Sequence, residues 1–377
     1  MYNKNLTIKR KFTKFLLQWH KKFNKRQMPW KGEKDMYKIW LSEIILQQTR
    51  VEQGMAYYNR FLVSFPSISR LAAARDAEVM KLWEGLGYYS RCRNLLATAR
   101  FITSELDGQF PKTYPELLKL KGIGPYTAAA LASFGLNQPH AVLDGNVIRV
   151  LARYFGIYEN AQTGTGKKIF SNLAQELIDL QEPGIYNQAI MDFGATVCKP
   201  ISPLCESCVM RKNCFAYQHQ QANDLPVKQK KSVKRQRWFY YLLVQVNGAF
   251  LVRERKQKDI WQHLNEFILL ESPRALSKKQ VLASGEFIDY VKLSETLPAV
   301  SKEYSQQLTH QAIYGRFIEI KLKKTPPLEG YQLKTKKSLQ KLAFPGFINK
   351  YLGEMKLKEP NTNKVLAFYE FKRLMYL

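Results

Sequence analysis

Four of the five cysteines in the chain lie within one short segment, at Cys198, Cys205, Cys208 and Cys214. Soft sulfur ligands at such short spacing can converge on one metal centre. Zinc and an iron–sulfur cluster are the two candidates. Structural zinc sites commonly pair two Cys-x2-Cys knuckles, whereas gaps of six, two and five residues give only one, so the spacing favours the cluster and leaves zinc open. The remaining Cys92 is interpreted as a small buried apolar residue.

A second segment suited to chemistry is the turn in LKGIGPYTAAA, where Gly122 and Gly124 flank Ile123 and Pro125 follows. Glycine lets the backbone approach a ligand closely. Proline at the first position of a helix leaves the remaining end amides pointing outward, where an anion is favoured. The pattern predicts a helix, hairpin, helix unit over about 115–134 that holds a DNA phosphate. An ordinary turn between helices is the alternative for an isolated Gly-x-Gly.

The net charge of the chain favours a polyanionic partner. Its 377 residues include 59 Lys and Arg against 31 Asp and Glu, a formal charge of +28. Charge of one sign repels itself on a compact body and is retained where phosphates meet it. No apolar run approaches the ~18 residues of a membrane span, and the lysine-rich start does not resemble a cleaved export signal. We therefore expect a monomer that binds double-stranded DNA, has no membrane partner and lies in the bacterial cytoplasm, associated with the nucleoid through DNA.

The elements that must position these residues begin with a helical region. Up to about residue 221, apolar residues recur with the 3.6-residue period of helices, and short Gly or Pro breaks separate the pieces. An apolar stripe near the start predicts a helix docked on its own domain rather than on a membrane. The residues of this stripe are Ile8, Phe12, Phe15, Trp19 and Phe23.

The composition changes after the last cysteine. Six Lys and Arg within 228–237 predict a basic linker over 222–237. From Trp238 onward, WFYYLLVQV and AFLVRERK flank Asn247-Gly248, the strongest short-range hairpin signal. The sequence thus predicts two domains, an all-helical one over 1–221 and one that contains sheet over 238–377. The last segment, LAFYEFKRLMYL, fits either a strand or a docked helix.

Several longer motifs resemble those of a known family. They are MPWK at 28–31, WLSEIILQQTR at 40–50, WEGLGYYSRCRN at 83–94, LKGIGPYTAAA at 120–130, VLDGNVIRVLAR at 142–153, YNQAIMDFGATVC at 186–198 and the cysteine ladder. Together they resemble the helix-hairpin-helix DNA glycosylases, specifically the MutY-type adenine DNA glycosylases. The resemblance implies an all-helical glycosylase domain whose loop at 198–214 holds one [4Fe-4S] cluster, followed by a Nudix-like α/β-sandwich domain.

The resemblance also implies an activity. Such an enzyme flips an adenine mispaired with 8-oxoguanine, or with guanine, out of the duplex and hydrolyses its N-glycosidic bond. One alternative is a related glycosylase of the same fold that acts on thymine, uracil or oxidised pyrimidines. Another is a non-catalytic DNA-binding protein in which the cluster is the functional part, and the two carboxylates described next count against it.

Breaking the bond between deoxyribose and adenine requires an acid that protonates the base and an anion that faces the sugar. Glu43 lies among apolar neighbours in WLSEIILQQ, which should raise its pKa above the ordinary ~4.3. Asp144 precedes the helix pattern GNVIRVLARYF, whose end amides would keep it ionised. The resemblance assigns Glu43 as the acid that protonates adenine N7 and later activates water, and Asp144 as the stabiliser of the sugar cation. Tyr126 and Asn146 match positions that assist near the sugar.

The residue after the hairpin bears on the fate of the DNA strand. Glycosylases of this superfamily that also cut the strand resemble this hairpin but carry a lysine at the second position after the final hairpin glycine, where its amine forms a Schiff base. Tyr126 occupies that position. The chain is therefore predicted to be monofunctional, to use water as the nucleophile and to leave an abasic site.

Contacts with DNA and a pocket for the extruded base follow from the same resemblance. Gln48 and Tyr88 match positions that wedge into the duplex, and the cysteine loop would present cations to phosphates. The full predicted DNA-binding set is Gln48, Tyr88, Gly122, Gly124, Lys199 and Arg211. Trp30, Leu46 and Gln188 would line the adenine pocket. Lys31 replaces the arginine often found after Pro-Trp, so the planar bidentate contact that an arginine makes is not expected here.

The second domain resembles, more weakly, the Nudix-like domain by which MutY-type enzymes inspect 8-oxoguanine, in DIWQHLNEF at 259–267 and LTHQAIYGRF at 308–317. The lesion differs from guanine by a donor at N7 and a carbonyl at C8, so a hydroxyl beside an imidazole is a suitable reader. Thr309 and His310 fit this requirement. The family more often has an aromatic residue and then Ser before the His. No Glu-rich hydrolase helix is visible, which predicts no nucleotide pyrophosphatase activity.

Overall fold

The computed structural model describes residues 6–227 and 233–356, in two compact units. Unit 1 is Met1–Ala73 with Asn94–Lys230, and unit 2 is Ala74–Arg93 with Lys231–Leu377. The C-terminal LAFYEFKRLMYL, for which the sequence left strand and helix open, lies outside the described residues, as does 228–232 of the predicted linker. Within the described ranges, no helix has the length and apolar character needed to cross a bilayer.

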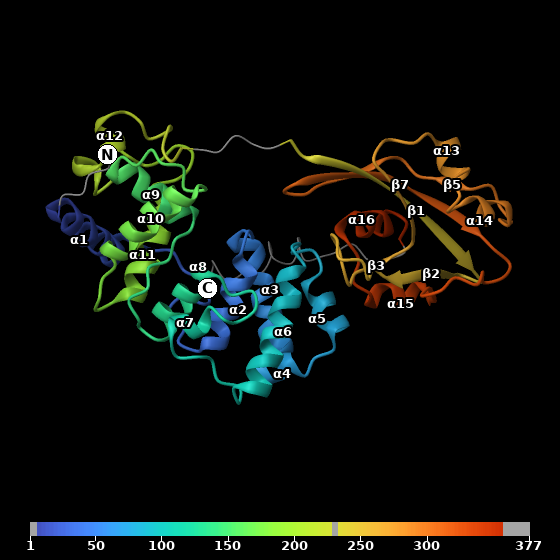
Figure 1. Cartoon of the computed structure of the whole chain (residues 1–377), viewed down its shortest axis with the longest axis horizontal. Helices are drawn as coiled ribbons and strands as arrows, with labels where there is room; N and C mark the ends of the chain where they lie inside the picture. Colours follow the sequence, from blue (N-terminus) through green and yellow to red (C-terminus); the bar gives the residue numbers. More distant parts are fainter. Residues whose placement is uncertain (1–5, 228–232, 357–377) are drawn as a thin grey trace. The chain divides into compact units, whose positions relative to one another are not determined.

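Unit 1 is built from helices, as the period of its apolar residues predicts, and no strand occurs within 6–227. Helix α6 begins in the segment that belongs to unit 2 and continues into unit 1. The elements, drawn from blue to yellow-green in Figure 1, are α1 (Leu6–Phe23), α2 (Met36–Leu46), α3 (Val51–Ser64), α4 (Ile68–Ala72), α6 (Ser90–Glu105), α7 (Tyr114–Leu117), α8 (Pro125–Ala130), η1 (Leu131–Gly135), α9 (Gly145–Phe155), α10 (Gly164–Leu177), α11 (Pro183–Thr196), η2 (Arg211–Asn213) and α12 (Phe215–Gln218).

Helix α1 is fastened to unit 1 by its apolar stripe. Phe12, Leu16 and Trp19 are buried, and Trp19 packs edge-on against Phe193 of α11 with ring centroids 5.0 Å apart. The predicted docking of this helix on its own domain is confirmed, although Phe23, the last residue of the stripe, is 61% exposed. Because α11 ends two residues before the first clustered cysteine, the packing of α1 also supports the start of the cysteine segment.

The predicted hairpin lies between α7 and α8. Helix α7 ends at Leu117, and turns lead from there to Gly122. Helix α8 begins at Pro125 after Gly124 and passes directly into the π-helical η1. Gly122 has a φ of 79°, and a Cβ there would lie 2.7 Å from the Cβ of Asn94, so both the backbone and the available space require glycine.

Unit 2 combines one helix from the N-terminal half of the chain with a mixed sheet and four further helices in its described part. These elements are α5 (Asp76–Trp83), β1 (Arg235–Val246), β2 (Ala249–Glu254), β3 (Asn265–Glu266), β4 (Ile268–Ser272), α13 (Lys278–Leu282), α14 (Ile288–Lys292), β5 (Ala299–Val300), β6 (Tyr304–Gln307), β7 (Gln311–Lys321), β8 (Gln332–Thr335), α15 (Lys336–Lys341) and α16 (Gly346–Glu354).

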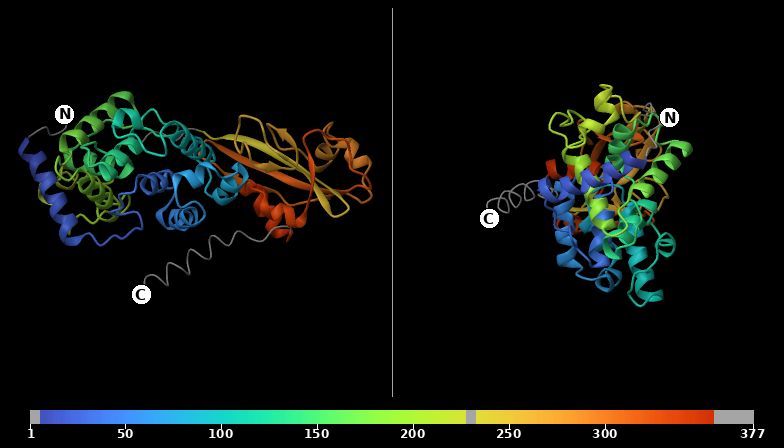
Figure 2. Two further views of the ribbon diagram at one scale, coloured as in Figure 1. Left: turned by 90° about the horizontal axis from the view of Figure 1, so that it is seen from below. Right: turned by 90° about the vertical axis from the view of Figure 1, so that its left-hand side faces the viewer.

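Strand β1 is the centre of the sheet, whose order is β3-β2-β1-β7-β5. It pairs in parallel with β7 from Arg235↔Gln311 to Gln245↔Lys321, and Figure 2 shows the two long strands side by side. It also pairs antiparallel with β2 across the predicted Asn247-Gly248 turn, where both residues have positive φ. The Asn-Gly pair predicts this hairpin because two-residue hairpin turns of type I′ require positive φ at both central residues.

The side chains of β1 alternate between two apolar layers, as the period of a strand requires. Tyr240, Leu242 and Val244 join the core that includes Val281 of α13. On alternate positions, Tyr241 stacks on Phe317 with ring centroids 5.6 Å apart, and Phe317 in turn contacts Phe347 of α16. Both faces of the sheet are therefore covered by helices. This mixed sheet forms a domain separate from the helical fold.

Helix α5 is held on unit 2 by a buried carboxylate. Glu84, only 6% exposed, accepts hydrogen bonds from the Phe344 backbone amide and from Asn349 Nδ2, both at 2.8 Å. Arg93 donates to the Gln262 carbonyl at 3.0 Å. The segment 74–93 therefore belongs structurally to the sheet unit, although it lies within the helical half of the sequence.

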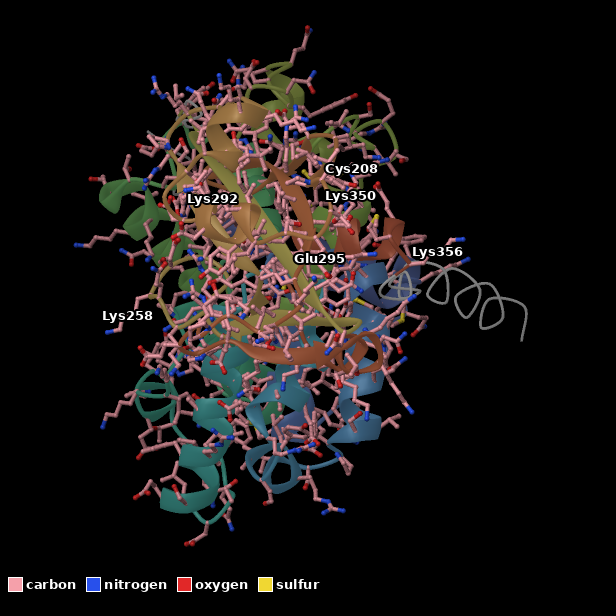
Figure 3. The ribbon with its side chains drawn as sticks, turned by 90° about the vertical axis from the view of Figure 1, so that its right-hand side faces the viewer. Cys208, Lys258, Lys292, Glu295, Lys350 and Lys356 are labelled. Atoms are coloured by element: carbon pink, nitrogen blue, oxygen red, sulfur yellow. The ribbon has the colours of Figure 1, made fainter. Side chains whose placement is uncertain are left out.

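Lysines of unit 2 contribute to the positive charge of the surface. Lys258, Lys292 and Lys350 are exposed, and Lys258 extends away from the ribbon in Figure 3. Lys350 Nζ lies 5.6 Å from the ring centroid of Tyr304, where the face of the ring attracts a cation. The excess of cations is consequently not confined to the helical unit.

Candidate active site

Glu43 is a carboxyl group removed from water in the middle of α2. The helix begins after Asp35, whose side chain accepts the Tyr37 amide at 2.9 Å, and nearly all of it is buried. Glu43 is 7% exposed. Burial raises its pKa to about 7, a hydrogen bond from Tyr126 acts in the opposite direction, and the charge of Asp144 raises it further. At neutral pH the group is therefore present in both protonated and ionised forms.

Tyr126 is the hydrogen-bond partner of Glu43. It is the second residue of α8, and its hydroxyl donates to Glu43 and lies 3.4 Å from the sulfur of Met191. Burial, followed by the charges of Glu43 and Asp144, raises the pKa of Tyr126 well above its ordinary value, so the phenol stays neutral and acts as a donor. The turn that ends the hairpin thus delivers a fixed hydrogen-bond donor to the site.

Asp144 is fixed by hydrogen bonds in its own helix. It is the N-cap of α9, where its Oδ1 accepts the Val147 amide at 2.8 Å and its Oδ2 accepts Asn146 Nδ2 at 2.7 Å. Both oxygens of the carboxylate are therefore held in place. Glu43, Tyr126, Asp144 and Asn146, four residues predicted from the sequence, are therefore brought together in one place.

Two arginines that the sequence did not single out connect α9 with the cysteine segment. Arg149 donates to Asn146 Oδ1 at 2.8 Å and to the Cys198 carbonyl at 2.7 Å. Arg153, 3% exposed, donates to the Lys199 carbonyl at 2.7 Å and lies 3.5 Å from the Cys198 sulfur. In the sequence, their spacing of four in VIRVLAR was a signal of a shared helix face. The cysteine segment is thus bonded to the helix that carries Asp144.

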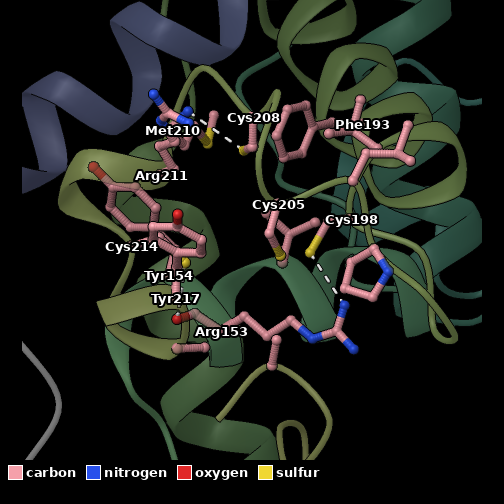
Figure 4. Close-up of a pocket in the computed structure, with 16 residues that line it drawn as sticks. Arg153, Tyr154, Phe193, Cys198, Cys205, Cys208, Met210, Arg211, Cys214 and Tyr217 are labelled. Atoms are coloured by element: carbon pink, nitrogen blue, oxygen red, sulfur yellow. Dashed lines mark hydrogen bonds between the residues drawn. The ribbon is translucent and has the colours of Figure 1, made fainter. Parts of the chain in front are cut away.

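The four clustered cysteines line one cavity of about 30 Å³ (Figure 4). Apolar residues, among them Phe193 and Met210, form much of its wall. Within 6–227 and 233–356, no group of three or more His, Cys, Asp or Glu side chains is placed to hold a single metal ion. The donor set, four thiols, fits an iron–sulfur cluster.

The predicted DNA contacts occupy several exposed turns. Gln48 and Tyr88 both have positive φ, 53° and 46°, and both are exposed. Nothing lies within 4 Å of a Cβ placed on Gly124, so the hairpin backbone is open there, unlike at Gly122. In the cysteine loop, Arg211 is exposed but also donates to the Glu206 carbonyl, and Lys199 is half-buried.

The predicted pocket residues contact α3 and α11. Trp30 packs edge-on against Tyr58 of α3 with centroids 5.4 Å apart, and a Cβ on Gly54, one turn earlier, would lie 2.8 Å from Leu46. Trp30 and Leu46 therefore lie along one face of α3. Gln188 donates from Nε2 to Asp192 on the next turn of α11, at 3.0 Å. Sequence reasoning missed Asp192, although its spacing of four from Gln188 in YNQAIMDFG places both on one face.

The predicted lesion readers lie in the turn between β6 and β7 of unit 2. Thr309 and His310 are both exposed there. The hydroxyl of Thr309 is hydrogen-bonded to that of Tyr88, which belongs to the same unit. A predicted wedge and a predicted reader are therefore adjacent, a proximity that their separation by 221 residues did not suggest.

Comparison with known proteins identifies the family. A model of the HhH-GPD superfamily of base excision DNA repair proteins matches residues 41–177. The adenine DNA glycosylase of Buchnera aphidicola subsp. Schizaphis graminum is 36% identical over 257 residues, which cover 67% of this chain and 73% of that protein. The chain belongs to the adenine DNA glycosylase family. The glycosylase of Homo sapiens is 41% identical over 219 residues, 56% of this chain and 40% of that protein.

A solved structure shares the fold of the helical unit. A thermostable thymine-DNA glycosylase is 28% identical to the chain, with a TM-score of 0.52, and covers 56% of this chain and 98% of its own. The helical glycosylase fold is thereby shown. The chain is a DNA glycosylase of base excision repair, and the buried acid of α2 lies inside the region that the family model matches.

The raised pKa of Glu43 predicts a pH dependence of stability. Between its ordinary value of 4.5 and its folded value of about 7, the folded chain keeps a proton that the unfolded chain releases. Stability is therefore lost as the pH rises through this window, by about 3 kcal/mol at ~1.4 kcal/mol per pKa unit. Glu43→Gln should not show this loss. The free energy of unfolding of Glu43→Gln minus that of the wild type should therefore increase from pH 4.5 to pH 8.

Urea denaturation at several pH values measures this difference. Glu176→Gln makes the same chemical change at an exposed carboxylate and should leave the slope of the wild type intact. Parallel curves for the wild type and Glu43→Gln would show that Glu43 has an ordinary pKa.

Proposed function

We propose that the chain hydrolyses the N-glycosidic bond of an adenine mispaired with 8-oxoguanine, or with guanine, in double-stranded DNA and leaves an abasic site. The observation that carries this proposal is the pairing of a buried carboxyl group whose pKa is about 7, Glu43, with a carboxylate held by a helix end, Asp144. Two carboxyl groups in different environments are suited to be an acid and an anion at the same pH.

In the proposed reaction, protonated Glu43 gives its proton to N7 of adenine as the bond to the sugar breaks. A base that leaves as a neutral molecule departs more easily than an anion. Tyr126 holds the carboxyl group in place, and after the base has left, ionised Glu43 accepts a proton from the attacking water. The near-neutral pKa lets one group serve in both steps.

Asp144 would stabilise the positive charge that develops on the sugar. Its two oxygens are already held by Val147 and Asn146, so the carboxylate need not reorganise during the reaction. Asn146 is in turn held by Arg149, which keeps its amide nitrogen directed at Asp144. With Tyr126 in place of a lysine after the hairpin, water is the nucleophile and the enzyme is monofunctional.

DNA binding would use exposed turns of the chain. Gly122 and Gly124 bring the hairpin backbone to a phosphate, Lys199 and Arg211 add cations, and Gln48 and Tyr88 enter the duplex. The extruded adenine would be received by Trp30, Leu46 and Gln188. We also propose that the chain acts as a monomer in the bacterial cytoplasm, on nucleoid DNA.

We propose that the four clustered cysteines hold one [4Fe-4S] cluster. Its support is that all four line one cavity. When bound, the cluster would cross-link the loop of residues 198–214 through four sulfur bonds. Arg149 and Arg153 hold the start of that loop on α9 through the carbonyls of Cys198 and Lys199.

The domain division proposed from the sequence assigns catalysis to residues 1–221 and lesion recognition to a Nudix-like domain over 238–377, joined by 222–237. Thr309 and His310 would read the N7 donor and C8 carbonyl of 8-oxoguanine. Their exposure and the contact of Thr309 with Tyr88 support this role, because the reader then lies next to the residue that enters the duplex.

Removal of either catalytic carboxylate should abolish base release. Glu43→Gln cannot donate the proton and Asp144→Asn cannot offset the charge on the sugar, so single-turnover release from an A:8-oxoguanine duplex should fall by at least about 10³-fold. Both variants should still bind the mispair in a gel-shift assay, and Glu176→Gln is the control for release.

Borohydride should trap no covalent complex between the wild-type protein and DNA. Rapid release by either variant, or a preference for T:G duplexes, would contradict the proposal.

Cluster content can be measured on the purified protein. We expect iron and acid-labile sulfide without zinc, together with the broad visible absorption of cysteine-ligated iron. Cys208→Ser should lower the iron content and the melting temperature, because the loop loses one of its bonds. Cys92→Ser, which changes a buried cysteine that does not line the cavity, should keep the iron of the wild type. Stoichiometric zinc in place of iron would contradict the proposal.

Lesion reading can be separated from catalysis. Thr309→Ala and His310→Ala should each reduce, by about tenfold, the ratio of adenine release opposite 8-oxoguanine to release opposite guanine, since each removes a base contact worth ~1–3 kcal/mol. Ser305→Ala deletes a hydroxyl on the neighbouring strand and should leave the ratio unchanged. An unchanged ratio in both reader variants would assign the lesion preference to another surface.

A further inference from the structure

A fully buried carboxylate connects two walls of the proposed adenine pocket. Asp192 of α11 is 0% exposed and accepts four hydrogen bonds. Arg26 and Gln188 donate to its Oδ1 at 2.9 and 3.0 Å, and Asn24 and Lys31 donate to its Oδ2 at 2.7 and 2.9 Å. A buried charge needs this degree of compensation, and here two cations and two amides provide it.

The chemistry of a carboxylate fixes the orientation of the Gln188 amide. An ionised carboxylate only accepts hydrogen bonds, whereas a primary amide has one donating and one accepting end. Gln188 must therefore turn its Nε2 toward the carboxylate of Asp192. The Nε2 of Gln188 donates to Oδ1 of Asp192 at 3.0 Å. Because the amide is planar, its Oε1 is directed away from Asp192. An acceptor is thereby left available on the other side of the group.

The same carboxylate holds the loop that carries Trp30. Lys31 Nζ donates to Asp192 and also to the Arg26 carbonyl at 2.8 Å, so the residues before and after Trp30 are tied to one point. Asn24 Nδ2 lies 3.0 Å from His20 Nδ1, which continues the network to α1. The loop of residues 24–31 and the Gln188 side of α11 are therefore set relative to one another by a single side chain.

We propose that Asp192 is a positioning residue that makes the pocket selective for a purine with a 6-amino group. This inference rests on the proposed assignment of Gln188 to the adenine pocket. By holding Gln188 Nε2, Asp192 presents Oε1 as an acceptor for the amino hydrogens of adenine. A 6-carbonyl purine such as hypoxanthine would place its carbonyl oxygen against Oε1 of Gln188. Both oxygens are acceptors, so neither would have a hydrogen-bond donor, and this costs free energy in a buried site.

The test compares release of adenine with release of hypoxanthine from otherwise identical duplexes under single-turnover conditions. Asp192→Asn keeps the shape of the side chain but adds a donor, so Gln188 can turn and offer its Nε2 to the base. We expect the ratio of adenine to hypoxanthine release to fall by at least about tenfold, since the pocket loses its discriminating acceptor. A lower melting temperature with an unchanged ratio would reduce Asp192 to a structural role and overturn the inference.

Gln188→Met separates this inference from the assignment on which it rests. The methionine keeps the length of the side chain without an amide, so it should lower the same ratio, and Asp192→Asn should have no further effect on the ratio in that background. A changed ratio in Gln188→Met but not in Asp192→Asn leaves the pocket assignment standing and refutes the role of Asp192. An unchanged ratio in Gln188→Met refutes the pocket assignment itself.

Glu266→Gln is the matched control for the loss of a buried ion pair. Glu266 is 1% exposed and is paired with Arg255 at 2.8 Å in unit 2, so its replacement should lower stability and leave the ratio intact. If Asp192→Asn does not fold, the wild-type protein offers a second measurement. This is the rate of hydrogen exchange of the Gln188 side-chain amide, whose signal is assigned by comparison with Gln188→Met. Strong protection of the Gln188 amide supports the inference, and exchange as fast as that of an exposed glutamine overturns it.

Discussion

The removal of the Glu43 carboxyl group from water is the constraint on which the site depends. A carboxylic acid in contact with solvent would be ionised at neutral pH and useless as a proton donor. Helix α2 places this group where burial raises its pKa to about 7, while Tyr126 prevents a larger rise. Asp144 lies nearby but obtains its hydrogen bonds from a helix end and from Asn146. Two carboxyl groups thus lie in different surroundings, one buried within a helix and the other held at a helix end.

The cysteine segment is part of this arrangement rather than an appendage. Arg149 bonds both the amide that holds Asp144 and the carbonyl of the first clustered cysteine, and Arg153 bonds the next carbonyl along the chain. Because guanidinium groups have several donors in a rigid plane, each arginine can fix two segments at once. Helix α9 therefore has a carboxylate at its start and, one and two turns later, the anchors of the cysteine segment.

Much of this fold could be predicted because the relevant signals are local. The apolar period shows the helices of unit 1, Pro125 marks the start of α8, and Asn247-Gly248 marks the hairpin. The burial of Glu43 could be predicted from its neighbours in α2. The remaining features depend on partners distant in sequence. Asp192 binds side chains more than 160 residues away, and no periodicity indicates which residues will meet.

Helix α5 shows the same limit and has a practical consequence. Its sequence indicates an amphipathic helix but not the unit on which it packs, and the structure places it on the sheet unit through Glu84. The polypeptide therefore leaves the helical unit after Ala73 and returns to it at Asn94. A protease cut in the basic linker would not yield two self-sufficient fragments. The N-terminal product would carry helix α5 without the sheet on which it packs, so that the buried hydrophobic side chains of this helix would be open to solvent.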